Sequence, residues 1–232
     1  MQLAKNHLDI GLFTNNKDEM LHFWQEEIGL TFDHLGKLGG GVHQHRHFLG
    51  DGPTGPILKI NHARDPLIDA GPSGYQCLIL ARDGISETIE KTDPDGNKVM
   101  LVPTGYQGVS TIGVQVATSS LADFIQFYNT AMEFPKTESL GAVRINCGET
   151  VLIAEQSPDL PKDIPYLAKG YRYLTAQIFE ADNTHAQIIQ SGGIEGAPPR
   201  TLGTTVRFSF VRDKDGNWIE LSERTTLTGK AV

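Results

Sequence analysis

The sequence predicts an α+β protein in which curved antiparallel sheets carry helices on their outer faces. Segments with the alternating polarity of strands recur along the chain, amphipathic helical segments lie between them, and the order of these elements repeats. No G-x-G-x-x-G motif opens a helix and no G-x-x-x-x-G-K-[ST] motif occurs. A doubly wound parallel sheet that binds nucleotide phosphates is therefore not indicated.

The clearest repeat joins a strand to a helix. Leu8–Leu30 and Ile112–Phe134 each begin with an alternating strand, pass a pair of polar residues and enter an amphipathic helix. Asn16 and Ser120 stand where N-caps are expected, and Gly29 stands where the first helix should end. Two copies of one supersecondary unit are therefore predicted.

Each copy continues into further strands that are joined by glycine-rich turns. A second helix is predicted only in the C-terminal half, at Asn183–Gly193, because the matching stretch of the N-terminal half is too short. Pro103–Ser110 is rich in glycine and polar residues, so we place a domain boundary there. The predicted domains are residues 1–105, whose second repeat is shortened, and residues 106–232.

The composition is that of a folded acidic protein. Hydrophobic residues make up 39% of the 232 residues and the formal net charge is −8, with no run of lysine and arginine, so nucleic acid is not an expected partner. No stretch reaches the roughly 18 apolar residues of a membrane span, and the N-terminus lacks the apolar core of a signal peptide. Cys77 and Cys147 stand in apolar, strand-like segments, as buried free thiols do. We therefore predict a cytoplasmic protein without membrane partners.

One short phrase closes each half of the chain. Thr92–Leu101 and Arg212–Leu221 share the pattern D-x-D-G-N followed by an alternating strand. The aspartate is expected to cap a tight turn and the glycine to adopt a positive φ. Because successive side chains of a strand alternate between its faces, Glu220 should lie opposite its apolar neighbours, and Met100 takes its place in the first copy. The acidic residue is thus predicted to face the concave side of a sheet.

These repeats and closing phrases resemble those of the vicinal oxygen chelate superfamily, which includes glyoxalase I, bleomycin resistance proteins and extradiol dioxygenases. The resemblance spans nearly the whole chain and rests on the segments "LDIGLFTNNKDEMLHFWQEEIGL", "IGVQVATSSLADFIQFY", "DPDGNKVML" and "DKDGNWIEL". It implies two tandem glyoxalase-like domains built from βαβββ modules. It also implies a small-molecule substrate, with modules that pair either within one chain or between the two chains of a homodimer.

The resemblance further implies metal ligands on the first and closing strands of paired modules. In the first half the residues at these positions are Asp9, Lys59, Gln76 and Met100. In the second half they are Gly113, a residue near Ala154, Thr175 and Glu220. A lysine and a methionine do not suit a site for a hard cation, and in the second half only the glutamate is a convincing ligand.

The histidines offer a different metal site. His43, His45 and His47 occupy alternate positions, so on a strand they share one face, with neighbours about 6–7 Å apart. Two neutral imidazoles at that spacing, together with a carboxylate, suit a divalent Fe, Mn or Zn ion. We predict His45, His47 and Glu220 as the metal ligands.

Catalytic groups are expected beside this site. Glu220 is predicted as a ligand or general base, and His7 and Asp9, which alternate on the first strand, as catalytic or supporting groups.

Two functions of different classes fit these expectations. The first is a metal-dependent dioxygenase, lyase or isomerase acting on a small oxygenated organic molecule. The second is a metal-free ligand-binding or resistance protein of the same fold. In that case the histidines form a polar surface stripe, and Glu220 pairs with an arginine such as Arg207 or Arg172. The sequence leaves open whether the chain is an enzyme.

Overall fold

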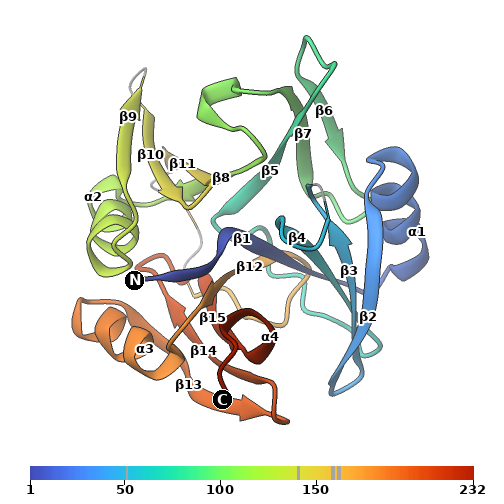
Figure 1. The fold of residues 1–232 in the computed structure, drawn as a ribbon. Coiled ribbons are helices and arrows are strands. Elements are labelled where there is room, and N and C mark those ends of the chain that lie inside the picture. The colour runs from blue at the N-terminus through green and yellow to red at the C-terminus, as the bar shows by residue number, and fades with distance from the viewer. Residues whose placement is uncertain (51, 140–141, 158–159, 161–162) are drawn as a thin grey trace.

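The computed structural model describes residues 1–50, 52–139, 142–157, 160 and 163–232. These residues form two β-sheets with helices on the outside (Figure 1), which confirms the predicted α+β architecture. The elements up to residue 108 are β1 (Leu3–Thr14), α1 (Lys17–His22), η1 (Phe23–Glu27), β2 (Thr31–Gly39), β3 (Val42–Phe48), β4 (Ile57–Ala63), β5 (Tyr75–Arg82), β6 (Ile89–Thr92), β7 (Lys98–Pro103) and η2 (Tyr106–Gly108). Those that follow are β8 (Ile112–Thr118), α2 (Leu121–Ile125), η3 (Gln126–Ala131), β9 (Lys136–Ser139), β10 (Ala142–Cys147), β11 (Thr150–Gln156), β12 (Gly170–Ile178), α3 (Ala181–Gln190), β13 (Ile194–Leu202), β14 (Val206–Arg212), β15 (Trp218–Arg224) and α4 (Thr225–Thr228).

The order of elements repeats as four modules. Modules one, three and four each run strand, helix and three strands, beginning at β1, β8 and β12. The second module consists of β5, β6 and β7, and residues 83–88 between its first two strands form no helix. Every helix of the described residues is too short or too polar to cross a bilayer.

Each sheet combines modules from both halves of the chain. The eight-stranded sheet has the order β13-β14-β15-β12-β1-β4-β3-β2, so it joins modules one and four. The seven-stranded sheet has the order β6-β7-β5-β8-β11-β10-β9, so it joins modules two and three. In each sheet the first strands of two modules pair antiparallel, which covers an edge that each module alone would leave open. The predicted domain boundary between residues 105 and 106 describes the order of the repeats along the chain and stays a prediction. Each sheet contains repeats from both sides of that boundary.

The helices of modules one and three begin differently. The Ser120 hydroxyl accepts a hydrogen bond from the Asp123 backbone N–H at 3.2 Å, which confirms it as the N-cap of α2. Asn16 makes no such bond, because its side-chain amide donates to Glu19 at 2.6 Å instead. Both helices then widen into π-helical turns, η1 and η3.

The main hydrophobic core contains side chains from both sheets and from the helices. On β1 the core-facing residues are Leu8, Ile10 and Leu12, which alternate with residues of the opposite face. Trp24 of η1 is fully buried in the same core. The alternation on β1 and its neighbours therefore leaves a second face of the eight-stranded sheet for polar side chains.

The two closing phrases form matching turns. The Asp213 carboxylate accepts hydrogen bonds from the backbone N–H groups of Asp215 and Asn217 at 3.0 and 2.9 Å. Asp93 accepts the corresponding bonds in the first copy, and the glycine of each turn has a positive φ, 88° and 85°. These turns direct β7 and β15 back into their sheets, as the sequence pattern predicts.

Candidate functional site

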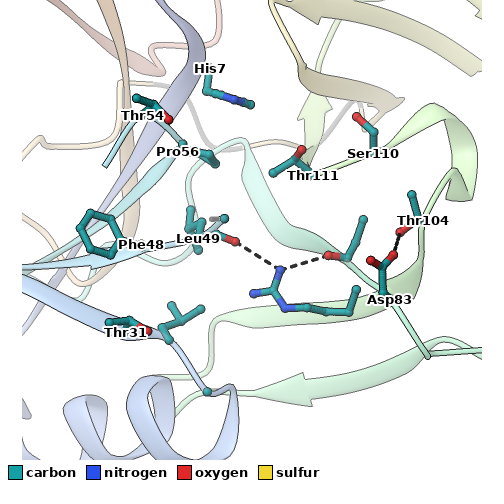
Figure 2. A pocket seen from close by; sticks show the side chains of 16 residues that line it. His7, Thr31, Phe48, Leu49, Thr54, Pro56, Asp83, Thr104, Ser110 and Thr111 are labelled. Carbon is teal, nitrogen blue, oxygen red and sulfur yellow. Dashed lines mark hydrogen bonds between the residues drawn. The ribbon is translucent and has the colours of Figure 1, made fainter. Parts of the chain in front are cut away.

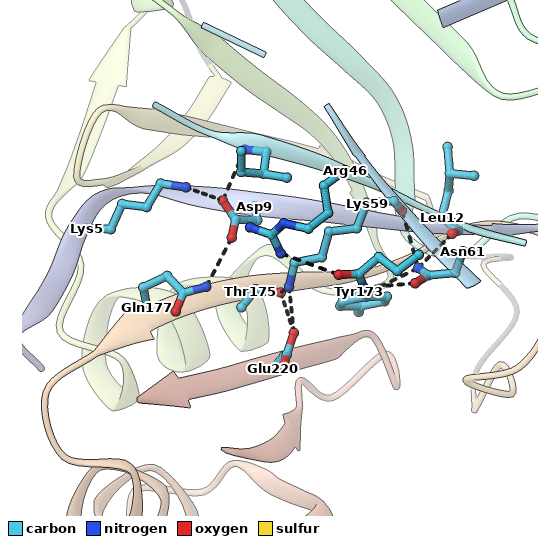
Figure 3. Close-up of polar contacts among 12 residues, drawn as sticks. Lys5, Asp9, Leu12, Arg46, Lys59, Asn61, Tyr173, Thr175, Gln177 and Glu220 are labelled. Atoms are coloured by element: carbon cyan, nitrogen blue, oxygen red, sulfur yellow. Dashed lines mark hydrogen bonds and ion pairs between the residues drawn. The ribbon is translucent and has the colours of Figure 1, made fainter. Parts of the chain in front are cut away.

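Alternate residues of four neighbouring strands form a polar face on the eight-stranded sheet (Figure 3). The strands lie in the order β15-β12-β1-β4. The side chains discussed below as the central polar network are Lys5, Asp9, Lys59, Thr175, Gln177 and Glu220.

An ammonium group lies at the middle of this network. Lys59 Nζ donates to Thr175 Oγ1 at 2.6 Å and to Glu220 Oε2 at 2.8 Å. The Thr175 hydroxyl in turn donates to the same glutamate oxygen at 2.7 Å. Lys59 is only 1% exposed, and burial lowers its pKa, although the carboxylates of Glu220 and Asp9 oppose that shift.

Glu220 is the acidic residue that the closing phrase places inside an apolar strand. Burial by itself raises the pKa of this carboxyl, but the Lys59 ammonium, Arg224 and the Thr175 hydroxyl together hold the pKa below its ordinary value. The alternation of the strand predicts the face on which Glu220 lies. The sequence analysis expects an arginine as its partner, whereas the structure shows Lys59. Lys59 carries the same signal as Glu220, a charge within the apolar segment "ILKIN", and a buried charge requires a partner of opposite sign.

Asp9 is fully buried and both of its oxygens are engaged. Oδ1 accepts from Lys5 Nζ at 2.6 Å and from the Ile57 backbone N–H at 3.0 Å, and Oδ2 accepts from Gln177 at 3.1 Å. Burial opposes its ionisation, but the two lysines outweigh burial and lower its pKa. Asp9 therefore serves as an anchor for β1 and β4 and has no free oxygen directed at a ligand.

The register of the sheet relates its two modules by an approximate two-fold axis. Asp9 of β1 pairs with Thr175 of β12, so these two residues are equivalent. The parallel neighbours β4 and β15 then make Ile57 the counterpart of Glu220. Lys59, which the resemblance places at that position, lies two residues further along β4 and extends its ammonium to the glutamate.

These residues do not fit a metal ion. The four equivalent positions are occupied by Ile57, Thr175, Asp9 and Glu220. Ile57 is aliphatic, both oxygens of Asp9 already accept hydrogen bonds, and Glu220 already binds the Lys59 ammonium. A divalent ion beside Glu220 would lie next to the charged Lys59. Within the described ranges, no three His, Cys, Asp or Glu side chains are arranged to hold a metal.

The predicted ligands His45 and His47 do not meet Glu220. Arg46 pairs with Lys59 across β3 and β4 and shares its polar face, so the histidines on either side of it lie on the opposite, core-facing side. Within that face the ring of His47 is fully buried, and its Nε2 lies 2.9 Å from the amide of Gln25 in η1. The histidines alternate on β3 as predicted, but they lie on the face of β3 that is directed toward η1. The structure therefore places His45 and His47 on the face of the sheet opposite to Glu220.

A cleft of about 580 Å³ lies between the first module and the seven-stranded sheet, and its lining side chains are drawn in Figure 2. One side is lined by His7, Leu30, Thr31, Phe48, Leu49, Thr54 and Pro56. The other side is lined by Ala81, Arg82, Asp83, Thr104, Ser110 and Thr111. Hydroxyl groups predominate among the polar side chains, and sequence reasoning missed the cleft because its walls come from loops and strand ends that lie far apart in the chain.

The charged groups of the cleft are held in place by neighbours. Arg82 Nη1 donates to the carbonyl oxygens of Leu49 and Ala81 at 3.2 and 3.0 Å, and Thr104 donates to Asp83 at 2.9 Å. Burial lowers the pKa of His7, although Glu149 opposes the shift, so the imidazole is neutral at pH 7. The predicted catalytic residues thus separate, with Glu220 and Asp9 in the central polar network and His7 in the cleft.

The corresponding face of the seven-stranded sheet is apolar around Met100, whereas Gln115, Arg144 and Glu155 lie further along it. Its buried side chains form a separate hydrophobic cluster of Ile79, Ala81, Val102, Val109, Val151 and Ile153. Met100 and Tyr106 pack against this cluster.

The order of elements within each module and the pairing of modules through their first strands can be compared with known families. Residues 111–221 match the family model of the Glyoxalase/Bleomycin resistance protein/Dioxygenase superfamily. This confirms the resemblance drawn from the repeats and closing phrases. A comparison with curated proteins finds no match.

Solved structures of similar fold cover almost the whole chain. Glyoxalase I from Zea mays superposes with a TM-score of 0.73 at 14% sequence identity, over 94% of this chain and 93% of that one. A candidate dioxygenase from Bacillus subtilis gives 0.69 at 13% identity, over 96% and 86%. The CppA protein from Streptococcus pneumoniae gives 0.55 at 13% identity, over 96% and 98%. At these identities the likeness concerns the fold alone.

Proposed function

We propose that the protein binds a small oxygenated organic molecule in the cleft of Figure 2, without a metal ion. The cleft carries this proposal, because its volume of about 580 Å³ suits a small ligand and its walls offer many hydrogen-bonding groups. Among the two functions that the sequence leaves open, this is the ligand-binding one. The metal-dependent enzyme is disfavoured by the misfit of the central polar network to a metal.

The polar groups of the cleft suit hydroxyl and carbonyl oxygens. The side chains of Thr31, Thr54, Ser110 and Thr111 make no hydrogen bond within the described part of the chain, so each can donate to or accept from a ligand. Neutral His7 adds a ring nitrogen, Nδ1, which is buried without a hydrogen-bond partner among those same residues. A buried polar atom without a partner costs free energy that a ligand can recover.

The remaining walls supply apolar contact. Phe48 is partly exposed at the cleft, and Leu30, Leu49 and Pro56 lie beside it. A ligand with a short carbon skeleton and several oxygens, such as a hydroxy-ketone, a diol or a catechol-like ring, matches both kinds of wall.

Binding is tested with a panel of hydroxy-ketones, diols and catechols added to chelator-treated protein. Chemical-shift changes in NMR spectra should localise to the cleft for at least one class of compound. His7→Gln should weaken that binding by about tenfold, whereas the control His34→Gln should not, because His34 is an exposed residue outside the lining. Shifts confined to other surfaces, or equal loss in both variants, would refute the cleft as the site.

Two accompanying expectations remain proposals, a cytoplasmic location and a homodimer. Phe32, Leu35 and Leu38 are each almost half exposed on the edge strand β2, which supports a contact between two chains. Light scattering at micromolar concentration checks this, and a monomeric mass would remove the homodimer.

A further inference from the structure

We propose that a second cleft, which lies where β5, β7 and β12 begin, binds a free α-amino acid with an apolar side chain. This second cleft has a volume of about 470 Å³, which suits a molecule of that size. Its walls come from three segments, within residues 69–76, 94–98 and 169–171. The inference goes beyond the proposed ligand of the cleft lined by His7, because the two clefts share no residue.

Two half-buried charges of opposite sign line the second cleft without meeting. Asp95 and Lys169 form no ion pair with each other or with any other residue that the structure describes. One oxygen of Asp95, Oδ2, is shielded from solvent and accepts no hydrogen bond from those residues. Because a partly desolvated charge without a partner costs free energy, a ligand gains by bringing an ammonium to Asp95 and a carboxylate to Lys169. An α-amino acid carries both groups.

The matching turn of module four shows what Asp95 lacks. Asp215 stands at the same place in the second closing phrase. Its carboxylate accepts hydrogen bonds from Thr118 Oγ1 at 2.6 Å and from the Ser119 backbone N–H at 3.0 Å, both at the strand-helix corner of module three. Within the described part of the chain no group donates to the Asp95 side chain, so the carboxylate of module two is left for a ligand.

A buried cation favours a carboxylate at the end of the second cleft that holds Lys169. The Arg172 side chain is 1% exposed, and its guanidinium donates to the carbonyl oxygens of Gly71 and Lys169, two residues of the cleft wall. Burial lowers the pKa of Arg172 to about 10, although Asp69 opposes the shift, so the guanidinium stays charged at pH 7. This positive charge behind the wall attracts the carboxylate of the ligand and repels its ammonium, which sets the orientation of the ligand.

The rest of the wall supplies apolar contact and is held in place. Pro72 and Pro94 are exposed at the second cleft, where their rings can receive an apolar side chain. The Tyr171 hydroxyl donates to the Lys98 carbonyl oxygen at 3.1 Å, and the Tyr171 backbone N–H donates to Asn97 Oδ1 at 3.3 Å. These bonds join two of the three wall segments, so the site is largely formed before a ligand arrives.

The first experiment removes one charge of the ligand at a time. Isotope-labelled protein is titrated with L-phenylalanine, L-leucine, 3-phenylpropionate, which lacks the ammonium, and 2-phenylethylamine, which lacks the carboxylate. Chemical shifts in NMR spectra should change at the second cleft with both amino acids, with a dissociation constant of about 1 mM. Each analogue of phenylalanine should bind about tenfold more weakly, because one of the two charge contacts is lost.

The second experiment removes one charge of the protein at a time. Asp95→Asn should weaken L-phenylalanine binding by about tenfold and leave 3-phenylpropionate unaffected, since that compound brings no ammonium. Lys169→Gln should weaken L-phenylalanine by a similar factor and leave 2-phenylethylamine unaffected. The matched control is Lys214→Gln, an exposed residue of the other closing turn and outside the cleft lining, which should bind all four compounds as wild type does.

Three results would overturn the inference. One is the absence of shifts at the second cleft with either amino acid at about 20 mM. Another is 3-phenylpropionate or 2-phenylethylamine that binds as tightly as L-phenylalanine. The third is a loss of affinity in Lys214→Gln equal to that in Asp95→Asn. Shifts confined to the cleft lined by His7 count as the first result, and because the two clefts give separate signals, the two proposals fail independently.

Discussion

The two sheets repeat one backbone plan but carry different side chains at the positions that match Glu220 and Thr175. In the eight-stranded sheet Glu220 pairs in register with Thr175, and both hold the Lys59 ammonium. In the seven-stranded sheet Met100 stands in the matching place, pairs in register with Ile79 and packs against an apolar cluster. The module therefore specifies the position of a side chain in space, whereas the chemistry at that position is free to vary.

The largest expected effect comes from breaking the charged pair. Lys59→Met leaves Glu220 buried without its ammonium and should lower the free energy of unfolding by about 3–5 kcal/mol. The double variant Lys59→Met/Glu220→Met makes this face resemble its apolar counterpart and should recover most of that loss. Urea unfolding of the single and double variants measures both, and equal losses would mean that the two charges are not coupled.

A pH titration tests the buried, neutral imidazole of His47 in the eight-stranded sheet. Burial, followed by the neighbouring His45, lowers the pKa of His47 from 6.5 to about 4. Because the unfolded chain binds this proton more readily, the contribution of His47 to stability is present above pH 6.5 and is lost as the pH falls to 4, by about 3 kcal/mol in total.

The control for this titration is His47→Gln, which should lose about 3 kcal/mol less than wild type between pH 7 and pH 4. Asp93 and Asp213, whose pKa values burial raises to about 6, act in the opposite direction in both proteins and cancel in the difference. Identical pH profiles for wild type and variant would contradict the buried, neutral imidazole.

The reverse exchange introduces a carboxylate into the seven-stranded sheet. Met100→Glu places a carboxylate against the apolar cluster and should cost about 2 kcal/mol at pH 8. The cost should shrink as the pH falls toward 5, because burial raises the pKa of the new carboxyl and it becomes protonated. Thermal melting at the two pH values measures this, and a cost independent of pH would point to packing alone.

The smallest expected effect compares the helices of modules one and three. Ser120→Ala removes a formed N-cap bond and should cost about 1 kcal/mol, whereas Asn16→Ala should cost less because its side chain caps no backbone N–H. Denaturant midpoints of the two variants measure the difference, and equal costs would mean that the cap bond of Ser120 adds nothing.

Local pattern predicted much of the fold. The repeat of strand and helix, the Asx-type turns at Asp93 and Asp213 and the orientation of Glu220 all depend on a few consecutive residues. The histidine stripe shows where such reasoning fails. Its spacing correctly places His45 and His47 on one face, but nothing in a single strand states which face turns toward the helix.

By itself, the sequence determined the modules, their turns and the alternation of side chains, because hydrophobic period and turn chemistry act over short distances along the chain. Only the tertiary structure decided that modules one and four share a sheet, that Lys59 reaches Glu220, and that loops from both halves enclose the cleft. The reason is physical. The contacts between modules one and four join residues more than a hundred positions apart, and their register follows from how strand edges pair and which faces enter the common core.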